Sequence, residues 1–339
     1  MGTLERLRQQ VQSPSVEKPS IILETSGTEG IPKTVVLSYE TLYASARIGQ
    51  KMEALHAGDC WLNCLPQYQI GGLAIRYRCE LAGATMLLHG SFNPQRIEQD
   101  CMRYAVTHLS LVPVMLSKLL HHFADGPPPA TLRTVLMGGD RLPKSLALQA
   151  VKAGWPIVVS YGMTETASRI TMLRLDVNNI GSWDEHDVGK PLPGVSLTIG
   201  GEGEVRIRSE QLFAGETREI VSGDAGAIDQ RGHLHIHGRL DDQILSAGIC
   251  IDPVEVEQRL QACPWVDSVG VAGCPDREWG ALIVAVFEQP LDDAVKQWVR
   301  EQMPSHLRPR RFIVVEQLQR TVSGKLDRHW LRKVVRNVA

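Results

Sequence analysis

Apolar and polar residues alternate in blocks along the first half of this 339-residue chain. Short apolar runs that proline or glycine ends are typical of buried strands, whereas apolar residues spaced three or four apart are typical of helices. Strands are expected at 61–65, 108–112, 132–137 and 157–160, and helices at 38–54, 97–104, 114–123 and 145–153. Strands and helices thus take turns up to about residue 165, which predicts a parallel α/β sheet.

The pattern changes at about residue 188, where short apolar segments alternate with glycine-rich turns. This spacing predicts a small β subdomain with strands at 195–199, 204–208, 225–228 and 234–237. A polar break follows at 239–242. Beyond it, an α+β domain is expected before a basic tail, with helices at 253–263 and 292–303 and strands at 266–272, 282–288 and 311–315. We therefore expect a large domain at 1–238 and a C-terminal domain at 243–339.

Composition narrows the classes of partner. The chain has 36 Lys and Arg against 38 Asp and Glu, and this balance does not favour a nucleic acid or a membrane surface. No apolar run approaches ~18 residues, so no membrane span is expected. Residues 1–12 lack the apolar centre of a secretory signal. Seven cysteines without a C-x-x-C pair predict free thiols and a cytoplasmic protein.

A turn near the N-terminus, Thr25–Lys33, carries the first candidate chemistry. Gly27 and Gly30 let the backbone approach an anion closely, and backbone N–H groups in such a turn can point at it. Lys33 adds a positive charge, and further donors are the hydroxyls of Thr25, Ser26 and Thr28. Only two residues separate the glycines, so the turn is not a Walker A loop. A polyphosphate would suit it; the alternative is a plain surface turn.

A second candidate segment, Ser160–Thr166, follows directly on an expected buried strand. Ligands of α/β sheets bind at the carboxyl ends of strands. Tyr161 offers a stacking face, Thr164 a donor to phosphate, and Glu165 a hard oxygen for Mg²⁺. The alternative is the start of a helix that Thr164 or Thr166 caps.

Six segments of the chain resemble, in order, the motifs of one enzyme superfamily. They are Thr25–Lys33, Leu136–Asp140, Tyr161–Thr166, Gly223–Asp224, Gly238–Asp242 and Thr321–Lys325. Each motif alone is weak, but six in the right order and at plausible spacing are a strong signal. The chain is identified as a member of the adenylate-forming superfamily, which contains acyl-CoA synthetases, luciferases and peptide-synthetase adenylation domains.

The resemblance implies ATP, Mg²⁺ and coenzyme A as cofactors, a hinge at 239–242, and a C-terminal domain that swings about Asp241. It implies catalytic roles for Thr164 at the α-phosphate, Glu165 at Mg²⁺, and Lys325 between the acid and the α-phosphate. The other implied ATP contacts are Thr25, Ser26, Gly27, Thr28, Gly30 and Lys33 at the outer phosphates, Gly139 and Tyr161 at adenine, and Asp224 and Arg239 at ribose.

Residues 65–72 resemble the wall of the family's acyl pocket, so Gln69 and Gly71 are expected to contact the acid. Arg78 follows shortly after and could meet a second carboxylate, which favours an aromatic dicarboxylate as the substrate. The alternative is that Arg78 is an exposed cation on a helix.

The chain departs from the family pattern at three places. Glu29 stands where Thr is usual, and its charge could weaken ATP binding unless Mg²⁺ or Lys33 offsets it. Gln69 stands where His is frequent. Relatives carry a long N-terminal subdomain before the phosphate loop, which begins here at residue 25. We therefore expect an acyl site that is more open, or that a partner completes.

Two other functions stay open at this point. One is a ligase for another aryl or fatty acid, or an adenylation domain that loads a carrier protein. The other is a nucleotide-binding protein without catalysis. A zinc site is also conceivable, because His233, His235 and His237 share one face of an expected strand. No fourth ligand is near in the sequence, so an exposed strand is favoured.

Overall fold

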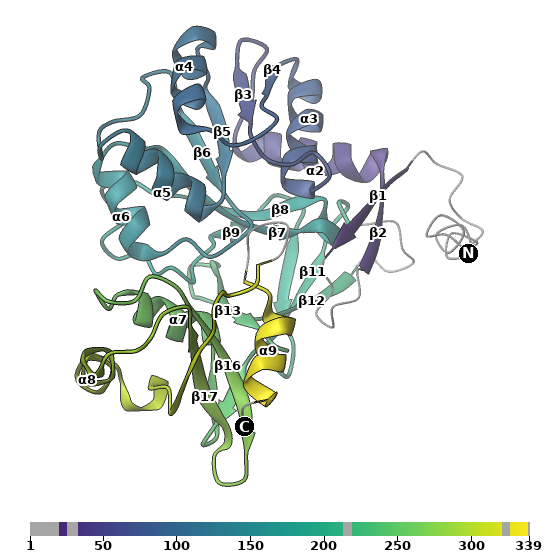
Figure 1. Ribbon diagram of the computed structural model, residues 1–339. Helices are drawn as coiled ribbons and strands as arrows, with labels where there is room; N and C mark the ends of the chain where they lie inside the picture. Colours follow the sequence, from purple (N-terminus) through teal and green to yellow (C-terminus); the bar gives the residue numbers. More distant parts are fainter. Residues whose placement is uncertain (1–19, 26–32, 213–218, 321–325, 338–339) are drawn as a thin grey trace, which may run out of the picture.

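A seven-stranded sheet lies at the centre of the computed structural model, which describes residues 20–25, 33–212, 219–320 and 326–337. The strand order is β4-β3-β5-β6-β7-β8-β9 (Figure 1). The bounds are β3 Cys60–Asn63, β4 Thr85–Leu88, β5 His108–Leu111, β6 Thr134–Met137, β7 Ile157–Met163, β8 Ser168–Arg174 and β9 Lys190–Pro191. The first five strands in this order are parallel, as predicted, whereas β8 and β9 add on antiparallel.

Helices cover both faces of this sheet (Figure 1). The bounds are α2 Tyr39–Met52, α3 Ile70–Ala82, α4 Pro94–Tyr104, α5 Pro113–His122 and α6 Lys144–Lys152. Successive strand residues point to opposite faces. Leu62 accordingly packs in the cluster that contains α4 to α6, whereas its neighbour Trp61 packs with α3. The predicted helix start at Ser38 is confirmed, because the Ser38 hydroxyl accepts the backbone N–H of Thr41 at 3.1 Å.

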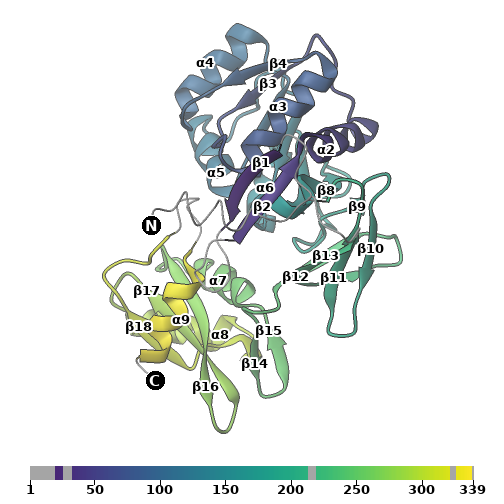
Figure 2. The ribbon, with the colours of Figure 1, turned by 90° about the vertical axis from the view of Figure 1, so that its right-hand side faces the viewer.

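Two antiparallel units stand beside the central sheet. The first is a hairpin of β1 Ser20–Thr25 and β2 Lys33–Ser38, whose last pair joins Thr25 to Lys33. The second is the predicted β subdomain, a four-stranded sheet that Figure 2 shows to one side. Its strands are β10 Ser196–Ile199, β11 Glu204–Arg208, β12 Glu219–Ile228 and β13 Leu234–Arg239. We call β1 to β13 with their helices the large unit.

The C-terminal unit, from β14 to α9, lies below the central sheet in both views (Figures 1 and 2). Its sheet has the order β16-β17-β18, and α7 and α9 contact β16. The bounds are β14 Ile244–Ser246, β15 Ile249–Ile251, α7 Pro253–Gln261, β16 Val269–Asp276, β17 Gly280–Phe287, α8 Asp293–Gln302, β18 Arg311–Val314 and α9 Arg328–Asn337. The segment expected to be a basic tail is instead helix α9 over most of its length. Leu331 and Val335, one turn apart, are buried and pack the helix on the sheet.

Buried apolar residues of the described chain fall into clusters that lie wholly before residue 237 or wholly after residue 243. Each unit thus has its own core. The boundary predicted at 239–242 nevertheless stays a prediction. Among the described residues, none of the helices combines the length and the apolarity that crossing a bilayer would require.

Candidate active site

The site begins where β5, β6 and β7 end side by side. Because parallel strands end at the same edge of a sheet, the residues that follow them form one rim. Ser160 Oγ donates to the carbonyl of Met137 at 2.8 Å and ties two of these ends together. Gly139 adopts φ +81°, and a Cβ there would lie 3.3 Å from Val112 Cγ1. Glycine suits this position, because it adopts the positive φ without strain and adds no side chain at the edge where a flat ligand could bind.

Three residues predicted to contact the nucleoside meet beside this rim. The Tyr161 hydroxyl donates to Asp224 Oδ2 at 2.5 Å, and Arg239 Nη1 lies 3.4 Å from Asp224 Oδ1. The pairing of Asp224 with Arg239 between β12 and β13 sets this geometry. Burial raises the pKa of Asp224, although Tyr161 and Arg239 act in the opposite direction. Burial, then the Asp224 charge, raises the pKa of Tyr161 well above its usual value, so its hydroxyl stays a donor.

The segment after β7 forms a one-turn 3₁₀-helix, Thr164–Thr166. The Thr166 hydroxyl accepts the backbone N–H of Met163 at 3.0 Å, which confirms the capping alternative for this residue. Thr164 and Glu165 are partly buried. Glu165 Oε1 accepts the ammonium of Lys33 at 3.3 Å, so the hairpin and the turn meet here.

Several predicted site residues lie outside the described residues: Ser26, Gly27, Thr28, Gly30 and Lys325, together with Glu29. Their expected roles stay predictions. The residues that flank them are placed. Thr25 and Lys33 close the hairpin, and Arg320 and Leu326 form an antiparallel bridge on either side of 321–325.

The predicted acid-binding residues belong to the start and the middle of α3. Gln69 precedes the helix and Gly71 lies in its first turn, both partly buried. Arg78 is only 4% exposed, so the alternative of an exposed cation is wrong. The sequence could not reveal this burial, because β8, which contacts α3 and supplies Ser168 beside Arg78, lies 90 residues later in the chain.

The Arg78 guanidinium is a buried charge with unused donors. Its Nη2 donates to Ser168 Oγ at 2.8 Å, and its Cζ lies 5.5 Å from the centre of the Trp61 ring. Within the described residues, Nε and Nη1 are buried without a hydrogen-bond partner. Burial, then the charge of Arg169, lowers the pKa of Arg78 well below its usual value. Unpaired N–H groups on a buried cation suit an incoming anion.

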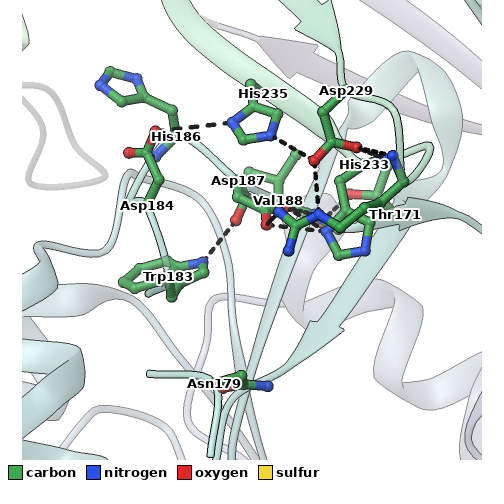
Figure 3. A network of polar contacts seen from close by, with 12 residues as sticks. Thr171, Asn179, Trp183, Asp184, His186, Asp187, Val188, Asp229, His233 and His235 are labelled. Atoms are coloured by element: carbon green, nitrogen blue, oxygen red, sulfur yellow. Dashed lines mark hydrogen bonds and ion pairs between the residues drawn. The ribbon is translucent and has the colours of Figure 1, made fainter. Parts of the chain in front are cut away.

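The expected exposed strand is confirmed for His237 but is wrong for His235 on β13 and for His233 just before it, which are both partly buried. Figure 3 shows His233 against Asp187, at 2.9 Å between Nδ1 and Oδ2, and His235 against Asp229, at 3.4 Å between Nε2 and Oδ2. The backbone N–H of His233 helps hold the pKa of Asp229 well below its usual value. Among the described residues, no group of three or more His, Cys, Asp or Glu side chains is arranged to hold a metal ion. The His233–Asp187 pair ties the loop before β9 to the start of β13, and the His235–Asp229 pair ties β13 to the turn that precedes it.

Comparison with known proteins finds matches over most of the chain. Residues 3–216 match the family described as AMP-binding enzyme, and residues 255–325 match the AMP-binding enzyme C-terminal domain. The 2-succinylbenzoate–CoA ligase of Bacillus mycoides is 33% identical over 348 residues, covering 95% of this chain and 71% of that enzyme.

Solved structures of the Bacillus subtilis o-succinylbenzoate CoA synthetase are also similar. The complex with the acyl-adenylate OSB-AMP gives a TM-score of 0.84 at 29% identity, over 92% of this chain and 68% of that one. The complex with ATP and magnesium ion also gives 0.84 at 29%, over 92% and 69%. A double mutant bound with the product analogue OSB-NCoA gives 0.62 at 29%, again over 92% and 69%. With matches that run through both units, this chain belongs to the family of AMP-binding enzymes.

Proposed function

We propose that this enzyme activates 2-succinylbenzoate with ATP and transfers the acyl group to coenzyme A, giving 2-succinylbenzoyl-CoA. The single observation that carries the choice of acid is Arg78, a buried guanidinium whose Nε and Nη1 have no hydrogen-bond partner among the described residues. A carboxylate is the natural partner for such a group, and an acid with a second carboxylate can supply it. The names of the similar enzymes agree with this substrate.

The chemistry needs two steps because a carboxylate is a poor acyl donor. Attack of the acid on the α-phosphate of ATP forms an acyl-adenylate and releases pyrophosphate. The thiolate of coenzyme A then displaces AMP. Negative charge accumulates in the first step, so donors and cations must already surround the reacting oxygens. Our candidates among the described residues are Thr164, which follows β7, and Lys33, whose ammonium lies 3.3 Å from Oε1 of the adjacent Glu165. Lys325 lies outside the described residues and is the third candidate.

The nucleoside is proposed to rest on the rim, with adenine between Tyr161 and Gly139. Asp224 would accept hydrogen bonds from the ribose hydroxyls, and Arg239 would hold that carboxylate in place. The contacts of Asp224 with Tyr161 and Arg239 support this role, because they leave the carboxylate fixed before a ligand arrives.

Glu165 suits the proposed role of Mg²⁺ ligand. Its side chain is 17% exposed, so it can reach a bound ion, and it stands beside the phosphate-side ammonium of Lys33. Mg²⁺ prefers hard oxygens and, in nucleotide sites, takes most of them from phosphate and water. One carboxylate at this position is therefore sufficient. When bound, the ion would offset the negative charge of the phosphates.

The large domain is proposed to end at residue 238, with a hinge at 239–242 and a mobile C-terminal domain from 243. Separate cores on the two sides support this division. Arg239 Nε donates to Asp241 Oδ1 at 3.1 Å, so the proposed hinge residue is held from the nucleoside side. Coenzyme A and ATP are cytoplasmic metabolites, and all seven cysteines are free thiols, so we place the enzyme in the cytoplasm.

Pyrophosphate release with a panel of acids tests the proposed function. We expect release with 2-succinylbenzoate to exceed that with benzoate or a fatty acid by about a hundredfold, which corresponds to about 2.7 kcal/mol for one buried charged contact. Mass spectrometry should detect the matching CoA thioester. Equal rates with monocarboxylic acids would indicate a different ligase. ATP binding without release for any acid would indicate a non-catalytic protein.

Substitution Asp224→Asn tests the ribose contact. We expect the KM for ATP to rise roughly ten- to a hundredfold, because the ribose hydroxyls lose a charged acceptor. The measurement is the rate of pyrophosphate release against ATP concentration. Asp293→Asn is the matched control, since that side chain is 93% exposed on α8. An unchanged KM in Asp224→Asn would remove Asp224 from the nucleotide site.

A further inference from the structure

One buried ion pair joins the two units. Arg141 Nη2 lies 2.6 Å from Asp252 Oδ2, and the two side chains are 10% and 7% exposed. Arg141 directly follows the Gly138–Asp140 rim, and its neighbour Leu142 packs in the core of the large unit. Asp252 begins α7, whose Val256 packs in the core of the C-terminal unit. The pair therefore spans the proposed hinge.

The surroundings leave little freedom to Asp252. Its Oδ1 accepts the backbone N–H of Val254 at 3.0 Å and caps α7, while Oδ2 meets Arg141. Gly238 has φ +100°, and a Cβ at that position would lie 2.7 Å from Asp252 Oδ1. A glycine just before the hinge is thus what lets this carboxylate come close.

The Arg141 guanidinium also has few other contacts in the part of the chain that the structure describes. Among the described residues, Nη2 contacts Asp252 and the carbonyl of Ile236, the latter at 3.4 Å. Within the described residues, Nη1 is buried without a hydrogen-bond partner. A rotation of the C-terminal unit that removed Asp252 would leave the Arg141 guanidinium without the carboxylate that it now pairs with. The two charges therefore favour this arrangement of the units over others, although the pair itself need add little net stability.

The arrangement resembles one state of the similar Bacillus subtilis enzyme more than another. Over the same 92% of this chain, the TM-score is 0.84 with the ATP and magnesium complex and 0.62 with the double mutant bound to OSB-NCoA. We infer that Arg141 and Asp252 are positioning residues that hold the C-terminal unit in place for adenylate formation and part before thioester formation. This inference rests on the proposed function.

The two half-reactions separate this role from a merely structural one. Asp252→Asn removes the charge but keeps a good N-cap for α7. We expect pyrophosphate release to fall about tenfold, which corresponds to about 1.4 kcal/mol. Thioester formation from supplied acyl-adenylate and coenzyme A should be unchanged or faster. Asp292→Asn is the matched control, because Asp292 is the exposed residue before α8. Equal loss in both half-reactions, or no loss in either, would overturn the inference.

A double variant tests the coupling. Arg141→Gln alone leaves Asp252 unpaired, whereas Arg141→Gln with Asp252→Asn leaves two neutral groups that can hydrogen-bond. We expect the double variant to lose less adenylation activity than the product of the single losses. Multiplicative losses would show that the residues act independently and would count against the pair.

A distance measurement tests the same inference without any reaction. Cys250 is exposed in the C-terminal unit, whereas the other six cysteines are buried, so it can carry one spin label. Val177→Cys, at a position that is 73% exposed in the large unit, supplies the second label. We expect Asp252→Asn to add a second distance that the parent protein lacks. An unchanged distance distribution would refute the proposed role of the Arg141–Asp252 pair. This result does not depend on whether any acid is a substrate, so the inference and the proposed function can fail separately.

Discussion

Replacement of Lys325 by alanine is expected to abolish pyrophosphate release while thioester formation from supplied acyl-adenylate continues. The first step needs a cation between the acid and the α-phosphate, where charge accumulates in the transition state. Loss of such a group costs at least about a hundredfold in rate. The second step displaces AMP and does not need that cation in the same place. The two rates are measured separately, by pyrophosphate release and by the CoA thioester.

The neighbours of Lys325 show which unit would carry it. Leu326 packs in the same cluster as α9 and β16, and a Cβ on Gly270 would lie 3.0 Å from its Cδ2. The described residues on both sides of Lys325 therefore belong to the C-terminal unit. Lys333→Ala is the control, because Lys333 is an exposed cation on α9. Equal loss of both half-reactions in Lys325→Ala would argue against two arrangements of the enzyme.

Local pattern was sufficient for the elements whose ends carry clear signals. Strand β5 ends before Pro113, helix α2 begins at Ser38, and Gly154 follows α6, so each was predicted within a few residues. Helix α9 was missed because its charged residues outweigh Leu331 and Val335, although these share one face. The antiparallel β8 was missed because a short 3₁₀ turn, rather than a helix, connects it to β7.

Only those residues of the site that belong to sequence motifs were predicted. Tyr161, Asp224 and Arg239 came from separate motifs, and the structure brings them into contact. The ion pair of Arg141 with Asp252 was not predicted. Its members are 111 positions apart in the sequence, and no local pattern or motif links them. The partner of His233 was missed for the same reason, because Asp187 lies 46 residues earlier and reaches this position only in the folded chain.

Substitution Arg78→Met is expected to change which acids the enzyme accepts. A buried cation with unused donors discriminates strongly for a ligand that supplies the missing acceptor, because without that ligand its N–H groups stay unpaired. We expect the KM for 2-succinylbenzoate to rise about a hundredfold. Activity with benzoate, which lacks the second carboxylate, should stay within about threefold of the parent. Pyrophosphate release against the concentration of each acid measures both.

Two further variants separate charge from geometry. Arg78→Lys keeps the charge but loses the planar fork, so we expect an intermediate KM for 2-succinylbenzoate. Arg76→Met is the control, because Arg76 lies on the same helix but is exposed. If Arg78→Met lowered activity with both acids equally, Arg78 would be a structural cation held by Ser168 and Trp61, and the acid would be recognised elsewhere. A selective loss of activity with 2-succinylbenzoate would mean that the second carboxylate of the substrate supplies the hydrogen-bond acceptors that the Arg78 guanidinium lacks in the protein.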